Sequence, residues 1–486
     1  MAPRNRIIID TDPGVDDVLA MLLAFSAKPE ELEVLLLSVT FGNIDVQSCL
    51  RNIITLFHFI EKERQWRKSN GRPEGFETLN ACKPIVAVGA EEPLADQIMM
   101  ADYFHGVDGL GGIHSSHPHL SPADTWKSLF DSALSSSDPE EAAAAREVQH
   151  SHTLFTPSKR PAHEEMLRLL RENEIDTITI VAIGPLTNLA TAAATDPEAF
   201  LRAKEVVVMG GAIDAPGNVP PLPLPHPSPT SHAPTPPPFN LIKQPATPLR
   251  AALNHRNQMT PGAEFNTYAD SVAAARVFAL TSPNPASTMP PVAPAPPGKQ
   301  SADPPPPFLS PYPEKLSRQL KLTLCPLDIT TPHELTRGQF TAYTASLLSP
   351  LSSSSSSPPS PLAEWSIAFL SSTFRKIESL TPNQTGDAVG LSLHDPLCIW
   401  YVMAPHMGGW RAEVCDVRVE TSGQWTRGCC VVDRRSRNRR EDAWEVGEDA
   451  GNWLSERLGN RVRVCVGSPG FDVFGGWLLE RVYGEK

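Results

Sequence analysis

Residues 7–17 constrain this chain more than any other feature, and they read I-I-I-D-T-D-P-G-V-D-D. Four carboxylates, those of Asp10, Asp12, Asp16 and Asp17, directly follow three apolar β-branched residues. Two ionised carboxylates about 4 Å apart repel by roughly 4 kcal/mol at an effective dielectric constant of about 20. An uncompensated cluster would raise its own pKa values or destabilise the fold. A hard, oxygen-seeking cation such as Ca2+ removes this repulsion, so the run predicts a cation site.

The same run predicts a strand, a turn and a helix in succession. Residues 7–9 have the composition of a strand buried on both faces, Pro13 and Gly14 impose a turn, and residues 15–25 carry apolar side chains at helical spacing. In an open α/β sheet, ligands bind beyond the carboxyl end of a strand, and the following helix start favours acidic side chains. A simple acidic helix cap would explain one or two of the aspartates but not four.

Composition and charge argue against several classes of function. The chain has 486 residues, and a hydrophobic content of 41% suffices for a sizeable core. The net charge of -13 argues against nucleic acid or an anionic membrane as a partner. Eight cysteines occur without a C-x-x-C pair, so neither a zinc site nor a disulfide framework is predicted. Because the N-terminal apolar run is broken by Asp10 and no apolar segment could span a bilayer, we expect a soluble cytoplasmic protein.

Strand-like and helix-like segments alternate along the chain, which predicts an α/β fold with an open, mainly parallel β-sheet flanked by helices. The expected strands are residues 6–9, 32–40, 85–89, 177–183, 205–209 and 322–324, and the expected helices include 15–25, 46–61, 163–173 and 186–195. We expect one domain over residues 1–486. Four segments rich in Pro, Ser or other polar residues are predicted to be disordered insertions, namely 115–161, 220–259, 283–313 and 349–361.

Further polar motifs follow the expected strands. They are F-G-N at 41–43, H-G-x-D-G-L-G at 105–111, G-P-L-T-N at 184–188, M-G-G at 209–211, G-N at 217–218, A-E-F-N at 263–266, P-L-D at 326–328 and H-D-P at 394–396. Each motif alone is a weak signal. Taken in this order after D-x-D-P-G-x-D-D, they closely resemble the inosine-uridine nucleoside hydrolases over residues 6 to at least 401. The resemblance implies a Rossmann-like nucleoside hydrolase fold and a single catalytic domain.

The resemblance also implies a site, residue by residue. Asp12, Asp17 and Asp395 would bind Ca2+ through carboxylates and Ile183 through its backbone carbonyl, and Asp12 would also be the general base. The residues implied to bind substrate are Asp16 and Asn43 near the ribose hydroxyls and the nucleophilic water, Met209, Asn218, Glu264 and Asn266 around the ribose, and His105 near the nucleobase. His394 would lie beside the base and protonate it. The resemblance assigns Asp10 no direct role, so we expect it to support the metal ligands from behind.

The implied reaction is Ca2+-dependent hydrolysis of the N-glycosidic bond of ribonucleosides, with uridine and inosine as the expected substrates, in nucleoside salvage. Such cleavage passes through an oxocarbenium-like ribosyl state, so a base must activate water and an acid must assist the leaving group. The resemblance further implies a homodimer or homotetramer with a small-molecule ribonucleoside as its ligand. Structural roles compete with these assignments, because single histidines are often structural and asparagines such as Asn43, Asn218 and Asn266 are common turn residues.

The chain departs from the family pattern at residues 220–259, which separate G-N-V from A-E-F-N although both should line one ribose. Two explanations stay open. The segment is a loop that returns to the same pocket, which loop-closure entropy permits, or it is a retained intron in the gene model. A catalytically impaired nucleoside- or metal-binding homologue is therefore the alternative function. A phosphatase of the haloacid dehalogenase type, whose motif also reads D-x-D, fits poorly because Pro13 stands where Thr or Val is expected.

Overall fold

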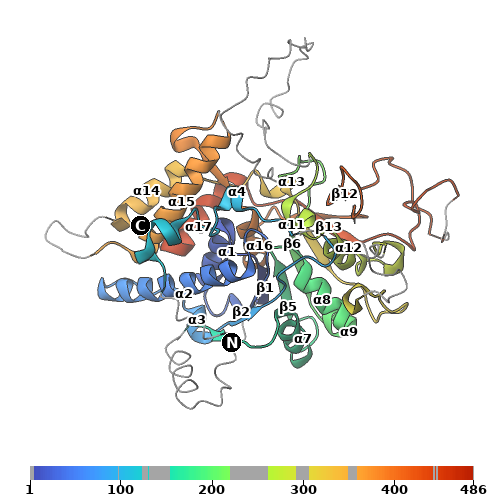
Figure 1. The fold of residues 1–486 in the computed structure, drawn as a ribbon, viewed down its shortest axis with the longest axis horizontal. Coiled ribbons are helices and arrows are strands. Elements are labelled where there is room, and N and C mark those ends of the chain that lie inside the picture. The colour runs from blue at the N-terminus through green and yellow to red at the C-terminus, as the bar shows by residue number, and fades with distance from the viewer. Residues whose placement is uncertain are drawn as a thin grey trace, which may run out of the picture.

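A nine-stranded sheet forms the centre of the molecule, in the order β10-β13-β7-β6-β5-β1-β2-β3-β4 (Figure 1). Neighbouring strands pair in parallel throughout, except that β10 and β13 are antiparallel. The predicted α/β class with an open, mainly parallel sheet is confirmed. This computed structural model describes residues 5–96, 98–122, 130, 154–218, 261–291, 306–348, 358–381, 383–441, 444 and 447–484.

The strands of this sheet are β1 (Asn5–Thr11), β2 (Leu32–Val39), β3 (Ile85–Val88), β4 (Thr156–Pro157), β5 (Ile178–Ala182), β6 (Glu205–Met209), β7 (Leu322–Cys325), β10 (Arg411–Cys415) and β13 (Val462–Gly467). Two small antiparallel pairs join β8 (Glu334–Thr336) to β9 (Gly390–Ser392) and β11 (Arg418–Val419) to β12 (Cys430–Val431). The expected strand segments therefore all form strands of the central sheet.

Helices cover both faces of the sheet, which the two sides of Figure 1 display. One face carries α1 (Val15–Phe25), α2 (Val46–Ser69), α15 (Pro361–Leu380), α16 (His394–Met403) and α17 (Phe471–Tyr483), with α14 (Arg337–Leu348) beside them. The other face carries α7 (Ala162–Glu172), α8 (Thr187–Thr195) and α12 (Ser271–Ala279). Side chains alternate along β1, so Ile7 and Ile9 pack in the first layer and Ile8 in the second.

The order of the strands creates a reversal beside β1. The chain runs from β1 outward through β2, β3 and β4, then returns to the other side of β1 to form β5. In doubly wound sheets, ligands bind in the crevice outside the carboxyl ends of the strands where the order reverses. The aspartate run leaves the carboxyl end of β1 and enters α1, so the topology places it in this crevice.

Parts of the predicted insertions lie outside the described residues, which omit 123–129, 131–153, 219–260, 292–305 and 349–357. The described ends of these segments belong to the fold. Residues 156–157 form the edge strand β4, Tyr312 is buried beside Arg276, and Ser360 caps α15. The insertions therefore remain a prediction for the residues between these ends.

Neither strand at the β10 edge of the sheet is among those predicted from the sequence. β10 reads R-A-E-V-C and is exposed at its first four residues, so it carries no hydrophobic alternation. β13 reads V-R-V-C-V-G and does alternate, which was an available signal. Helix α2 also runs beyond the expected residue 61, because a buried ion pair between Glu63 and Arg67, one helical turn apart, supports its polar second half.

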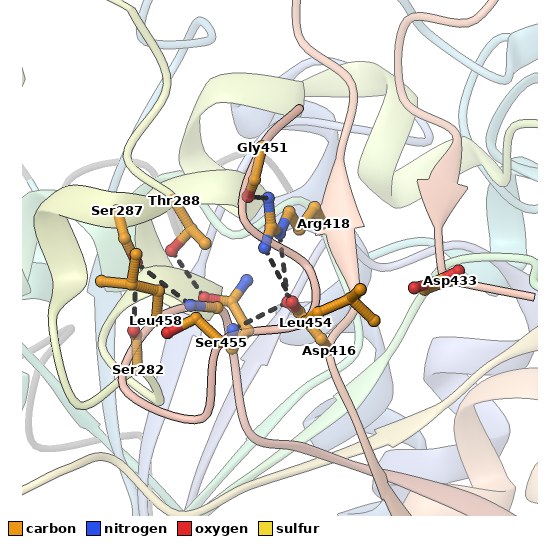
Figure 2. Close-up of polar contacts among 12 residues, drawn as sticks. Ser282, Ser287, Thr288, Asp416, Arg418, Asp433, Gly451, Leu454, Ser455 and Leu458 are labelled. Carbon is orange, nitrogen blue, oxygen red and sulfur yellow. Dashed lines mark hydrogen bonds and ion pairs between the residues drawn. The ribbon is translucent and has the colours of Figure 1, made fainter. Parts of the chain in front are cut away.

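A buried polar network fixes the chain immediately after β10 (Figure 2). The Asp416 carboxylate accepts hydrogen bonds from the Arg418 guanidinium and, at 2.8 Å, from the backbone N–H of Asn460. Thr288 donates to the Asn460 side-chain carbonyl at 2.6 Å, and Arg418 also donates to the carbonyl of Gly451 at 2.7 Å. The network therefore ties the C-terminal segment to the loop after α12.

Two further expectations concern cysteines and membranes. All eight cysteines are free thiols, in agreement with the prediction of no disulfide framework. Within the described part of the chain, none of the helices combines the length and the apolar composition that crossing a bilayer requires.

We expect the substitution Asp416→Asn to lower the free energy of unfolding by about 3 kcal/mol, because it removes the charge that compensates a largely buried guanidinium. Urea denaturation measures this change. The matched control is Asp214→Asn, which removes a solvent-exposed partner of Arg434 and should change stability by less than about 0.5 kcal/mol. Equal effects of the two variants would contradict the structural role of Asp416.

Candidate metal centre and active site

Three carboxylates from two helix starts meet in the crevice beside β1. Asp16 and Asp17 lie in the first turn of α1, Asp395 lies in the first turn of α16, and one oxygen from each lies within 4.8 Å of the others. All three are buried. Ca2+ binds oxygen ligands at about 2.3–2.6 Å, so ligands on opposite sides of the ion stand about 5 Å apart. The spacing of this cluster therefore fits a single Ca2+.

The Asp12 carboxylate lies next to this cluster with one oxygen held and one oxygen unpartnered. Its Oδ2 accepts a hydrogen bond of 2.7 Å from the backbone N–H of Asn43. Its Oδ1 is buried and has no hydrogen-bond partner among the described residues. A Cβ at Gly42 would stand 2.0 Å from Oδ2, and a Cβ at Gly184 would stand 2.6 Å from Oδ1. The chain can approach Asp12 this closely only because both positions are glycine.

Asp17 is oriented by four hydrogen-bond donors, one of which is the backbone N–H of Asp12. Its carboxylate accepts hydrogen bonds from Thr11 Oγ1 at 2.6 Å, from the backbone N–H of Gly14 at 3.0 Å and from Asn43 Nδ2 at 3.0 Å. Asn43 Nδ2 also donates to the carbonyl of Asp12 at 3.1 Å. Asn43, predicted to lie near the ribose and the water, therefore also fixes the relative placement of two predicted metal ligands.

Asp10 is embedded behind the cluster, as expected for a supporting residue. It accepts hydrogen bonds from Ser38 on β2 and, at 2.9 Å, from Asn188 Nδ2 on α8. The Asn188 side-chain carbonyl accepts from the N–H of Ala90 at 2.8 Å, so this one amide connects the ends of β1, β2 and β3. Sequence reasoning assigned Asn188 no role. Its only signal was its position at the end of the G-P-L-T-N motif.

Burial and mutual repulsion shift the titration of this cluster in the cation-free protein. Burial raises the pKa of Asp10 and of Asp16 to about 7, with repulsion from Asp17 adding to the shift of Asp16. Burial first, and then the neighbouring aspartates, raises the pKa of Asp12 and of Asp395 well above the ordinary range. The cluster would therefore hold protons at neutral pH unless a cation replaces them.

The predicted ribose wall is assembled from the ends of β5 and β6, the loop that contains Asn218, and one short helix, α11 (Phe265–Ala269). Asn266 Nδ2 donates to the carbonyls of Ile183 at 3.1 Å and Met209 at 3.3 Å. The buried Glu264 carboxylate caps α11, accepting from the N–H groups of Asn266 at 2.7 Å and Thr267 at 3.0 Å, and it also accepts from Gly211 N–H at 2.8 Å. Glu264 therefore organises the wall by binding backbone donors.

The two flanks of the undescribed residues 219–260 lie side by side. Gly217 N–H donates to the carbonyl of Pro261 at 3.1 Å, and Asn218 N–H donates to that of Ala263 at 3.1 Å. The Asn218 side-chain carbonyl accepts from Phe265 N–H at 2.8 Å. The ribose wall is thus continuous across the point at which the chain departs from the family pattern.

Two imidazoles occupy the predicted nucleobase side. His105 Nδ1 accepts a hydrogen bond of 3.3 Å from Val15 N–H, which leaves the ring proton on Nε2. His394 Nδ1 lies 2.8 Å from Thr330 Oγ1. Burial lowers the pKa of His394 to about 4, and burial together with repulsion from His394 lowers that of His105 to about 3. Both rings are therefore neutral at pH 7 in the free protein.

The structure thus brings the predicted site residues together beyond the carboxyl ends of β1, β5 and β6. Asp16, predicted near the ribose hydroxyls and the water, shares its cluster with the predicted ligands Asp17 and Asp395. Asp12 lies beside this cluster, and its backbone N–H donates a hydrogen bond of 3.2 Å to the Asp17 carboxylate. The Ile183 carbonyl, predicted to bind the metal, contacts Asn266.

Fold and site together define a class of α/β protein with a buried cluster of carboxylates at the switch point of a parallel sheet. The family model described as inosine-uridine preferring nucleoside hydrolase matches residues 7–452, and the chain belongs to this family. Its members are hydrolases that act on N-glycosyl compounds, which confirms the resemblance stated above.

Individual relatives match at moderate identity. Uridine nucleosidase 1 of Arabidopsis thaliana is 32% identical over 222 residues, which cover 46% of this chain and 49% of that protein. The chain therefore spans about half the length of this plant relative. A non-specific ribonucleoside hydrolase of Klebsiella pneumoniae is 24% identical over 440 residues, covering 89% of this chain and 90% of that protein.

Two solved structures share the fold. A plant nucleoside hydrolase superposes with a TM-score of 0.57 at 20% identity, covering 99% of both chains. A purine-preferring ribonucleoside hydrolase from Gardnerella vaginalis has a TM-score of 0.57 at 17% identity and covers 99% of this chain and 98% of that chain.

We expect Ca2+ to stabilise the protein more at high pH than at low pH. Raised carboxyl pKa values mean that the folded state binds more protons than the unfolded chain between about pH 4 and 7, so these groups lower stability as pH rises. The buried histidines have lowered pKa values and act in the opposite direction, so the informative quantity is the difference that the cation makes.

Thermal melting of chelator-treated protein, with and without Ca2+, measures this difference. The increase in melting temperature should be larger at about pH 7.5 than at about pH 5.5, because the cation must displace protons at the lower pH. An increase that is independent of pH would place the cation elsewhere than among these carboxylates.

Proposed function

We propose that this protein is a Ca2+-dependent ribonucleoside hydrolase that converts uridine or inosine into free base and ribose, in nucleoside salvage. One observation carries the proposal. Asp12 has one oxygen fixed by Asn43 and the other buried without a partner, beside the carboxylates of Asp16, Asp17 and Asp395. Membership in the nucleoside hydrolase family, and relatives named uridine nucleosidase and non-specific ribonucleoside hydrolase, support this substrate class.

The residues that would hold the cation are Asp12, Asp17, Asp395 and the carbonyl of Ile183. All of them offer hard oxygen ligands, and the buried acidic cluster needs compensating charge, so the donor set fits Ca2+. Asp16 shares the cluster, which agrees with its proposed place beside the nucleophilic water. When bound, Ca2+ supplies orientation of the water, a lower water pKa and chelation of the ribose 2′ and 3′ hydroxyls.

Asp12 would act as the general base through Oδ1. Because Oδ2 already accepts the N–H of Asn43, Oδ1 is the oxygen that remains to take a proton. The absence of a side chain at Gly42 and Gly184 leaves room for the carboxylate in this orientation. A base held in one orientation reduces the entropy that the reaction must lose when water attacks C1′.

The ribose wall offers both a hydrogen-bond acceptor and a hydrogen-bond donor. Asn266 uses Nδ2 to bind two carbonyls, so its Oδ1 is available to accept a ribose hydroxyl. Asn218 uses Oδ1 to accept Phe265 N–H, so its Nδ2 is available as a donor. Met209 contributes an apolar surface, and Glu264 holds the wall in place from beneath. Binding energy gained at the ribose would be used to position the bond that breaks.

On the side of the leaving group, His105 would donate a hydrogen bond from Nε2–H to the nucleobase. His394 would stabilise the nucleobase as it departs. The hydroxyl of Thr330 can donate to His394 Nδ1, which places the ring proton on Nε2. With a pKa of about 4, the neutral ring would act as a hydrogen-bond donor at pH 7. Full proton transfer, as proposed from the sequence, would require the bound base to raise that pKa.

The adjoining flanks of residues 219–260 favour an intact site over the catalytically impaired alternative. Residues 220–259 remain predicted as an insertion or a retained intron, which sequencing of the mature transcript decides. We also propose a cytoplasmic homodimer or homotetramer without nucleic-acid or membrane partners. The charge of -13 and the eight free thiols support this part of the proposal.

An assay of ribose release tests the proposed function. Uridine and inosine should be hydrolysed with Ca2+ present, and chelation should remove the activity. We expect Asp12→Asn to retain the melting temperature but to lose at least about 100-fold in kcat, because the amide cannot accept the proton from water. Near-normal turnover in Asp12→Asn would exclude it as the base, and no turnover of any nucleoside by the unmodified chain would refute the function.

We expect His394→Ala to slow uridine and inosine far more than p-nitrophenyl riboside, by a differential factor of about 10- to 100-fold. The nitrophenolate leaves without assistance, whereas a nucleobase needs a donor. Kinetic constants for both substrate types measure the difference, and His105→Ala provides the comparison within the same pocket. An equal loss on both substrate types would indicate that His394 has a structural role.

A further inference from the structure

The two edges of the central sheet differ in how they end. β4 contains only two residues, Thr156 and Pro157, and a proline and a short length are common means of blocking an edge. β10 contains five residues without proline, and its first four residues are exposed. Val414, near its end, is 63% exposed. Within the part of the chain that the structure describes, no strand pairs with the outer side of β10, which leaves a row of backbone donors and acceptors open there.

The free side of β10 is regular and held in place. The irregularity between β10 and β13 pairs Arg411 with Gly467 and Ala412 with Cys465, so the extra residue, Val466, belongs to β13. The network around Asp416 fixes the chain directly after β10 (Figure 2). An edge that is already ordered loses little conformational freedom when another strand binds to it.

The sequence of this edge is complementary to itself. Residues 410–414 read W-R-A-E-V. If two copies pair antiparallel about a two-fold axis at Ala412, Arg411 of each copy stands opposite Glu413 of the other. Trp410 of each copy then stands opposite Val414 of the other. Opposite charges and aromatic residues facing β-branched ones are favourable cross-strand pairs.

In such a pair of strands, one face would carry only apolar side chains and the other face only charged side chains. Because side chains alternate along a strand, Trp410, Ala412 and Val414 share one face, and Arg411 and Glu413 share the other. Trp410 packs with the core layer that contains α16 and α17, which assigns the apolar face to that side of the sheet. Within the described residues, neither Arg411 nor Glu413 forms an ion pair.

We propose that β10 is an interface between two copies of this chain, paired antiparallel about a two-fold axis through Ala412. The two central sheets then continue into one another across the axis. The contact is isologous, so the same short strand supplies both halves of each pair.

Charge reversal with rescue tests this interface, using light scattering after size-exclusion chromatography of the full chain. Wild-type protein should have at least twice the 52.9 kDa mass of one chain. Arg411→Glu and Glu413→Arg should each place like charges opposite each other. Each variant should halve the measured mass of the assembly and raise the dissociation constant of the interface by at least about 10-fold. The double variant Arg411→Glu with Glu413→Arg exchanges the charges and should restore the wild-type mass.

Unchanged melting temperatures would show that the exposed substitutions leave the fold intact. A monomeric wild type would overturn the proposal. So would single variants that keep the wild-type mass, or a double variant that remains as dissociated as the single ones.

Cross-linking tests the register. The axis places the two Ala412 side chains opposite each other, with Cβ atoms about 5 Å apart. In Ala412→Cys, diamide should accept the two thiol hydrogens as a disulfide forms between the copies, giving a covalent dimer. Val414→Cys is the matched control on the same face, because it meets Trp410 and should not cross-link. Cross-linking of Val414→Cys but not of Ala412→Cys would overturn the proposed pairing.

Discussion

Electrostatic repulsion among buried carboxylates at the end of β1 determines much of the surrounding architecture. Four aspartates of the N-terminal run are buried, namely Asp10, Asp12, Asp16 and Asp17. Asp395 at the start of α16 is buried beside Asp16 and Asp17. The protein holds most of these groups in fixed directions with backbone N–H groups and amides rather than with basic side chains. Neutral hydrogen-bond donors orient the carboxylates but do not neutralise their negative charge. The cluster therefore favours binding of a positively charged ion. Gly42 and Gly184 permit the close approach, and the sheet reversal beside β1 provides the space.

Much of this arrangement was predictable because its signals are local. The strand, turn and acidic helix start are contiguous in residues 7–17, and α1 begins and ends where the periodicity indicates. The resemblance located Asp395 and the ribose wall through short motifs. The role of Asn188 was not visible, because its partners Asp10, Ser38 and Ala90 are brought to it by three strands of the sheet. Glu264 likewise reads as a free carboxylate in the sequence, and only the fold supplies the backbone donors that it binds.

The edge strand β10 shows a different limit of sequence reasoning. Strand prediction depends on alternation between buried and exposed positions, and β10 has exposed side chains on both faces. Its pairing with β13 is what makes it a strand. By contrast, the departure at residues 220–259 suggested an interrupted pocket, yet Gly217 and Asn218 contact Pro261 and Ala263 directly. A long excursion in sequence is thus compatible with a short distance in space, since both ends are held by a few backbone hydrogen bonds.

The position of Asp395 in the chain has a consequence for how the protein is made. Asp12, Asp16 and Asp17 are synthesised well before α16, from which they are separated by the sheet strands β2 to β7. These three aspartates therefore spend part of translation without the carboxylate that completes their cluster. During that time they can remain solvated or protonated, and the first strand and helix need not be buried against α16. The acidic cluster is therefore complete only after β1 to β7 have been synthesised, so a cation that needs Asp395 as a ligand would bind late in assembly.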